Sequence, residues 1–152
     1  MALITRRSLI LGSTAALAAT VPLAADDGYP VMMVYKSPTC GCCGAWIEHV
    51  EAHGFRVAVQ NLPDITVAKR ELGVPQELWS CHTARIGDYL VEGHVPAIDI
   101  ERMLSERPAI AGIAVPGMPA GSPGMEVPGY SEAYDVYAFG SGGHDVFARH
   151  GG

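Results

Sequence analysis

The sequence predicts a mixed α/β domain in which helices flank one sheet and a β-hairpin closes the chain. Apolar runs of strand length alternate with segments whose apolar residues recur at helical spacing. The chain then ends on two short runs of strand character joined by a glycine-rich turn, which is typical of a hairpin. At 152 residues it has about the length of one domain.

The first half of the predicted domain is a strand–helix–strand–helix unit. Residues 31–35 form a continuous apolar run, which predicts a buried strand, and residues 55–59 alternate as a second strand does. Between them lies a predicted helix that ends at Gly54. Asp64 is a suitable N-cap for a second helix, which Gly73 ends. The apolar face of the first helix carries residues at spacings of three and four: Cys43, Trp46, Ile47 and Val50.

The second half completes the fold. Residues 84–92 predict a strand or hairpin, and Pro96 suits the first turn of a third helix that ends before Pro108. Residues 134–139 and 145–148 predict the two strands of the terminal hairpin. This order predicts a thioredoxin-like sheet with flanking helices. Such folds place a reactive cysteine at the turn between the first strand and its helix.

One segment differs in character from the rest. Residues 112–130 contain five glycines and four prolines, a composition that predicts a long loop with no regular element. Long loops within compact domains usually carry function or are disordered. We expect residues 116–126 to form a lid over the cysteines.

The first 25 residues have the pattern of an export signal. They lack acidic residues, carry Arg6 and Arg7 ahead of a modest apolar stretch, and end on Ala24 and Ala25. The paired arginines also resemble a bacterial twin-arginine signal. We therefore expect residues 1–25 to be removed and residues 26–152 to form a single metal-binding domain. No apolar stretch in that domain is long enough to span a membrane.

Composition excludes other classes of function. Ten basic residues against sixteen acidic ones give a net charge of −6, which argues against a nucleic-acid binder. A hydrophobic content of 49% argues against intrinsic disorder. Four cysteines are too few for a disulfide-dense miniprotein, so their clustering points to chemistry.

Three of the four cysteines lie at the predicted start of the first helix. Unpaired N–H groups and the helix dipole stabilise thiolates at such a position. Cys40 and Cys43 have the C-x-x-C spacing of a thiol–disulfide couple, whereas Cys40 and Cys42 have a C-x-C spacing that can chelate a soft ion. Because Cys42 and Cys43 are adjacent and point in different directions, the three thiolates are better placed to bridge two or more ions than to bind one.

Further soft ligands follow along the chain. Cys81 is followed directly by His82, and His94 comes twelve residues later. Loops after neighbouring strands gather at one end of a sheet, so we expect Cys81 and His94 to join the first three cysteines. Thiolates and imidazoles favour Cu(I), zinc or iron–sulfur clusters. Iron–sulfur clusters usually have wider cysteine spacings, and copper also explains the thioethers of Met118 and Met125 in the long loop.

These motifs together resemble the CopG-like family, small periplasmic bacterial proteins linked to copper resistance and long filed as a domain of unknown function. The resemblance spans about residues 31–148. It implies a thioredoxin-like fold, a periplasmic location and copper handling, with Cys40, Cys42, Cys43, Cys81 and His94 matching the family's cysteine/histidine motif and His82, Met118 and Met125 lying in other matching blocks. The blocks that carry it are residues 35–43, 80–84, 91–97, 106–110, 114–119 and 121–126.

Three classes of function follow. The first is a periplasmic protein that sequesters, buffers or redox-converts Cu(I)/Cu(II), which binds more than one copper ion and uses zinc less readily. The second is a thiol–disulfide oxidoreductase in which Cys40 and Cys43 are catalytic, and the third is an interaction module stapled by disulfides. The additional Cys42 and the separate Cys81 and His94 favour the first, a binding protein rather than an enzyme. We expect metal ions and other periplasmic copper proteins as partners, and neither nucleic acid nor a membrane.

Overall fold

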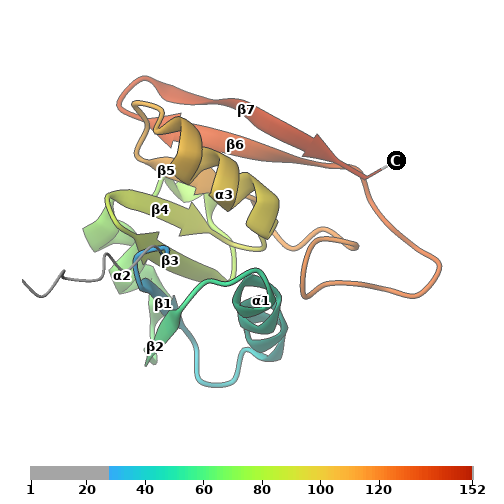
Figure 1. Cartoon of the computed structure of the whole chain (residues 1–152). Helices are drawn as coiled ribbons and strands as arrows, with labels where there is room; N and C mark the ends of the chain where they lie inside the picture. The colour runs from blue at the N-terminus through green and yellow to red at the C-terminus, as the bar shows by residue number, and fades with distance from the viewer. Residues whose placement is uncertain (1–27, 152) are drawn as a thin grey trace, which may run out of the picture.

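The computed structural model describes residues 28–151, so the predicted export signal lies outside the described residues. Its centre is a seven-stranded sheet with the strand order β2-β1-β3-β4-β5-β6-β7, shown in Figure 1. In the part of the chain that the structure describes, three α-helices and one short 3-10 helix connect the strands. Within residues 28–151, no helix has the length and apolar character needed to cross a membrane.

The first half of the fold is the predicted strand–helix–strand–helix unit. It consists of β1 (Met32–Lys36), α1 (Gly41–Ala52), β2 (Val57–Asn61) and α2 (Ile65–Leu72), with β1 and β2 parallel. The Asp64 side chain caps α2 by accepting a hydrogen bond from the Thr66 backbone N–H at 2.9 Å. Gly73 ends α2 in the left-handed conformation, at φ 76°.

The next elements complete a thioredoxin-like layer. After the 3-10 helix η1 (Gln76–Leu78), β3 (His82–Ile86) pairs antiparallel with β1, and β4 (Tyr89–Glu92) pairs antiparallel with β3. Helix α3 (Ala97–Glu106) follows. The order β2-β1-β3-β4 with these helices confirms the predicted fold class, and residues 84–92 belong to a hairpin whose first strand begins at His82.

The C-terminal part extends this sheet. Strand β5 (Gly112–Ala114) runs parallel to β4, and β6 (Tyr134–Gly140) and β7 (Gly143–His150) form the predicted hairpin. The prediction that residues 112–130 contain no regular element is wrong for β5. Gly112 is not a turn residue there: a Cβ at this position would collide with the Leu90 backbone, so the glycine permits close strand pairing.

Two helices share one face of the sheet. Trp46 of α1 and Ile100 of α3 belong to the same buried cluster, together with Val34 of β1. The Trp46 indole N–H donates to the Val95 backbone oxygen at 2.8 Å, which ties α1 to the turn that precedes α3. Helix α2 contacts β1 and β3. Its Lys69 contacts side chains of β3 and β4 that alternate with the residues of this cluster and therefore lie on the opposite face of the sheet.

Candidate metal centre

The cysteine motif lies at the N-terminus of α1, as the sequence predicts. Cys40 is the N-cap residue, with extended backbone angles, and Cys42 and Cys43 lie in the first helical turn. Residues three apart on a helix lie on one face, and Cys40 and Cys43 are joined by a disulfide with Cα atoms 5.5 Å apart. Cys43 is fully buried, whereas Cys40 and Cys42 are partly accessible.

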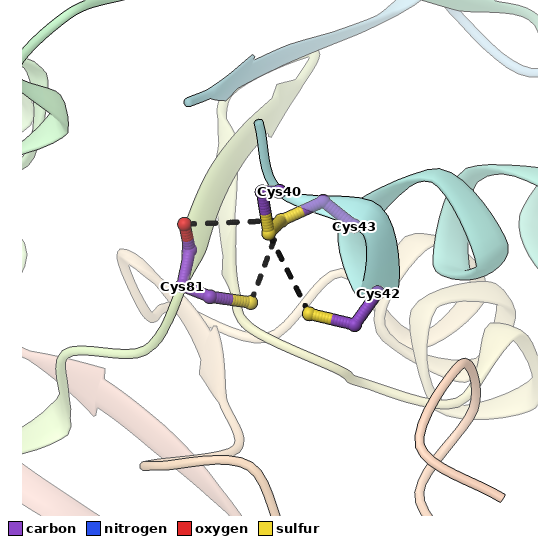
Figure 2. A group of neighbouring side chains, drawn as sticks. All are labelled: Cys40, Cys42, Cys43 and Cys81. Carbon is purple, nitrogen blue, oxygen red and sulfur yellow. Dashed lines mark hydrogen bonds between the residues drawn. A yellow bond between two sulfur atoms is a disulfide. The ribbon is translucent and has the colours of Figure 1, made fainter. Parts of the chain in front are cut away.

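The two remaining thiols contact this disulfide. Figure 2 shows the Cys42 and Cys81 sulfurs both directed toward it. The Sγ atoms of Cys42 and Cys40 are 3.5 Å apart, and those of Cys81 and Cys43 are 3.6 Å apart. Disulfide sulfurs carry no proton, so Cys42 and Cys81 are the thiols that can donate. All four sulfurs lie within 4.8 Å of one another, although Cys81 lies 38 residues after Cys43.

Cys81 also belongs to a second group, with two histidines. Its Sγ lies 2.9 Å from His94 Nε2 and 3.4 Å from His82 Nδ1. His82 begins β3, and His94 lies in the turn between β4 and α3. These three ligand atoms also lie within 4.8 Å of one another. Cys81 is thus the residue shared between a group of four sulfurs and a group of one sulfur and two imidazoles.

The hydrogen bonds of His94 fix its tautomer. Its Nδ1 lies 2.7 Å from the Pro123 backbone oxygen, which can only accept, so Nδ1 carries the proton. The lone pair of a neutral His94 is then on Nε2, the atom that faces Cys81. Metal-binding histidines commonly use a backbone carbonyl in this way to orient the ring and raise its basicity.

His82 is buried and lacks a partner on one ring nitrogen. Its Nε2 makes no hydrogen bond in the described part of the chain, which is unusual for a fully buried polar atom. The ring packs against Trp46 at a centroid distance of 4.3 Å and lies edge-on to His94 at 5.2 Å. Burial, and secondarily the nearby His94 and Lys69, hold the pKa of His82 well below its usual value. A neutral imidazole is the form that binds metals.

The other ligand groups have shifted pKa values as well. Burial lowers the pKa of His94, so that this ring is also neutral over a wide range. Burial, followed by the charge of Cys42, raises the pKa of the Cys81 thiol to about 12. A soft cation bound at Cys81 must therefore displace a proton.

Part of the long loop packs directly onto this site. Ser122 and Pro123 are buried, and a Cβ at Gly124 would lie 2.9 Å from the Cys42 backbone oxygen and 2.8 Å from the Trp46 backbone nitrogen. Gly124 also has a φ of 83°, so glycine is required there both for backbone conformation and for close approach. The methionines of this loop differ in exposure, because Met118 is 51% exposed and Met125 is half-buried.

A buried charged network supports the loop that carries Cys81. Glu92 Oε1 accepts from Lys69 Nζ at 2.5 Å and from the Ser80 backbone N–H at 2.6 Å. Its Oε2 accepts from Thr83 Oγ1 at 2.6 Å. Glu92 therefore fixes the residues on both sides of Cys81 and His82. The sequence itself indicates no role for Lys69 or Glu92, because no signal links two positions that lie 23 residues apart.

Other histidines serve different contacts. His49 Nε2 accepts the Ala97 backbone N–H at 3.1 Å and so satisfies a free donor at the start of α3. His53 follows one helical turn later, with Nδ1 2.9 Å from the His49 backbone oxygen. His150 pairs with Asp99 of α3 at 2.5 Å and stacks on Tyr134.

Comparison with known proteins agrees with this description. The model of the family "Protein of unknown function, DUF411" matches residues 78–125. Two solved structures titled copper resistance protein CopG, Form 2 and Form 1, are each 45% identical to this chain with a TM-score of 0.76. They align over 80% and 82% of this chain, respectively, and over 99% of their own. The search of curated proteins gave no match.

Fold and site together define a thioredoxin-like protein with a cluster of soft cysteine and histidine ligands. At 45% identity over most of its length, the chain belongs to the CopG-like family, which confirms the resemblance seen in the sequence. The relatives and the ligand cluster both support a copper-related role.

Proposed function

We propose that this protein is an exported copper-binding protein that sequesters and buffers copper and contributes to copper resistance. The observation that carries the proposal is the pair of overlapping ligand groups that share Cys81. One group offers sulfur alone, and the other adds the imidazoles of His82 and His94. Solved relatives that are titled copper resistance proteins support the same role.

The donor set favours Cu(I) over zinc. Thiolates are soft ligands, and Cu(I) is a soft cation. Zinc takes four ligands in a closed tetrahedral site, which would leave donors of this cluster unused. Because the Cys81 thiolate lies in both groups, it is placed to bridge two ions, and we propose that the reduced protein binds more than one Cu(I). Met118 and Met125 are proposed as additional weak thioether ligands from the loop above.

The disulfide gives the site a means of redox conversion. When Cys40 and Cys43 are reduced, their two thiols can reduce two Cu(II) ions. Each copper gains one electron, the two sulfurs lose one electron each and form the disulfide, and two protons are released. A dithiol donor that reopens the disulfide restores four thiolates for Cu(I). Redox conversion and Cu(I) storage therefore use the same sulfurs.

The proposed site of action is the periplasm. Residues 1–25 supply the export signal, and residues 26–152 are the mature metal-binding domain, with other periplasmic copper proteins as partners for copper transfer. Replacing Arg6 and Arg7 with lysine should leave precursor in the cytoplasm if the twin-arginine route is used. Normal export of that variant would exclude this route.

Titration of the reduced mature protein tests the copper proposal. Competition with a Cu(I) chelator should give saturation above one equivalent, and excess zinc should not release the copper. A free-thiol count on the same sample reports whether four thiolates are available. Saturation at one equivalent, or release of copper by modest zinc, would contradict the proposal.

A thiol–disulfide oxidoreductase is the second candidate function. The C-x-x-C disulfide at the start of α1 in a thioredoxin-like sheet favours it. A protein substrate must reach Cys40, because Cys43 is fully buried. Catalysed reduction of insulin by the metal-free protein, with dithiothreitol as donor, would support this function, and loss of that activity in Cys40→Ser would assign it.

A further inference from the structure

The disulfide is in contact with a free thiol at each of its sulfurs. Cys42 Sγ lies 3.5 Å from Cys40 Sγ, and Cys81 Sγ lies 3.6 Å from Cys43 Sγ. Thiol–disulfide exchange begins with attack of a thiolate on a disulfide sulfur. Both contacts place an attacker beside a target, so the surroundings of each thiol decide which of them reacts.

A base is positioned at only one of these two thiols within the described residues. His94 Nε2 lies 2.9 Å from Cys81 Sγ, and the bond from His94 Nδ1 to the Pro123 backbone oxygen leaves Nε2 free to accept a proton. A thiol, a base within hydrogen-bond reach and a third group that orients the base form the usual arrangement of an activated nucleophile. Cys81 is therefore the thiol with a base beside it, and proton transfer to His94 has to overcome the burial that disfavours the Cys81 thiolate.

The leaving group is also favourably placed. Attack on Cys43 expels Cys40, which is the N-cap residue of the twelve-residue helix α1. Free N–H groups and the helix dipole stabilise a thiolate at that position. Thiol–disulfide exchange is faster when the departing sulfur is the better stabilised thiolate.

We propose that the disulfide migrates within the site, from Cys40–Cys43 to Cys43–Cys81, with His94 as the base. The proton of Cys81 passes to His94 Nε2, Cys81 Sγ forms a bond to Cys43 Sγ, and the Cys40–Cys43 bond breaks with its electron pair on Cys40. The proton then returns through solvent to the Cys40 thiolate. Nothing is oxidised or reduced overall, and the exchange needs no other reactant.

Migration changes which ligands the oxidised protein offers. Before it, the free thiols are Cys42 and the Cys81 of the histidine group. After it, they are Cys40 and Cys42, a partly accessible C-x-C pair suited to a two-coordinate Cu(I) ion. This consequence for copper rests on the proposed function, whereas the exchange is a property of the metal-free protein.

A variant with one free thiol tests the exchange. Oxidised, metal-free Cys42→Ser protein is treated with N-ethylmaleimide, quenched in acid, and mapped by mass spectrometry. Migration puts label on Cys40 as well as on Cys81. Label on Cys81 alone, or on Cys43, overturns the proposal. Cys42→Ser combined with Cys81→Ser should take up no label, which controls for reduction or incomplete oxidation.

A second measurement tests the base. In the Cys42→Ser background, alkylation of Cys81 competes with migration, and loss of a general base should slow migration about a hundredfold. At equal maleimide concentration, His94→Gln should therefore shift label from Cys40 to Cys81. The exposed His53, changed to Gln, is the matched control and should leave this distribution unchanged. An unchanged distribution in His94→Gln overturns the role of His94. If Cys42→Ser does not fold, a Cys43–Cys81 linked peptide from acid-quenched wild-type protein provides the same test, and its absence contradicts migration.

These experiments contain no copper, so their failure is distinguishable from failure of the copper proposal. Loss of exchange with normal Cu(I) binding would leave a copper protein with a fixed disulfide. Exchange without Cu(I) binding would support the migration and contradict the copper proposal.

Discussion

The two ligand groups that share Cys81, the sulfur side and the imidazole side, differ in how far their ligands are fixed in advance. On the sulfur side, Cys40 and Cys43 are joined by a disulfide, so the ligand set there depends on oxidation state. On the imidazole side, His82 and His94 are buried, and the tautomer of His94 is fixed by the Pro123 carbonyl. The protein thus places a redox-variable set of ligands beside a preformed one.

Removing the residue that belongs to both sides should have the largest effect on metal binding. Cys81→Ser removes a donor from both groups, so we expect loss of at least one bound Cu(I) and a fall in affinity beyond the roughly 10- to 100-fold typical of an outer-shell change. His94→Ala removes one donor from one group and should have a smaller effect. Chelator competition measures both, with circular dichroism and His53→Ala as controls. Equal losses of Cu(I) binding in the two variants would show that the two ligand groups do not bind copper independently.

The buried Lys69–Glu92 pair, which supports the imidazole side, should make a large contribution to the free energy of unfolding. Glu92→Gln leaves Lys69 buried without its counter-charge, and breaking a buried pair in this way costs about 3–5 kcal/mol. Chemical denaturation of the metal-free protein measures this loss. Combining Glu92→Gln with Lys69→Met removes both charges and should recover much of the free energy of unfolding. A double variant no more stable than Glu92→Gln would contradict the explanation by charge.

The buried histidines should make stability depend on pH. Burial, together with His94 and Lys69, lowers the pKa of His82 in the folded state, so the unfolded chain binds more protons below its ordinary pKa of about 6.5. Stability is therefore full above that pH and falls as the pH drops toward the folded pKa, by up to about 1.4 kcal/mol per pH unit for this one group.

Thermal melts of the metal-free, oxidised protein measure this slope. They are recorded between about pH 7.5 and 5, because histidines titrate in roughly this range. His82→Leu should have a smaller slope than the wild type, whereas the exposed His53→Gln should not change it. Equal slopes for His82→Leu and the wild type would mean that His82 does not carry the effect.

The smallest expected effect concerns the loop. The double change of Met118 and Met125 to leucine keeps size and apolarity but removes both sulfurs, so Cu(I) retention should weaken modestly while the cysteine site stays assembled. Unchanged Cu(I) affinity and an unchanged X-ray absorption edge would show that both methionines only pack. That outcome would confine the ligands to the two sides of Cys81.

Much of the fold could be predicted because local patterns agree with it. The apolar run of β1, the Asp64 cap and the Gly73 stop each act within a few residues. Strand β5 was missed because its glycine was counted as a loop residue, although Gly112 serves close strand pairing. The sequence could not choose among the possible cysteine pairings, because that choice depends on where Cys81 lies in space.

Two features of the site correspond to no pattern in the sequence. The partner of His94 Nδ1 is the backbone oxygen of Pro123, and any residue could supply a carbonyl. The pair of Lys69 and Glu92 joins positions 23 residues apart, and in the sequence each has the appearance of an ordinary surface charge. Contacts made by the backbone or across the fold require the structure.

The short span of the Cys40–Cys43 disulfide has a consequence for the unfolded chain. It links residues three apart, whereas a Cys43–Cys81 bond would close a loop across 38 residues. The entropy of loop closure favours the shorter ring in a flexible chain by about 2 kcal/mol. Folding offsets that bias by holding Cys81 against Cys43. At equilibrium the unfolded chain therefore favours the Cys40–Cys43 pairing, and only the folded protein supplies the contact that favours the longer-range bond.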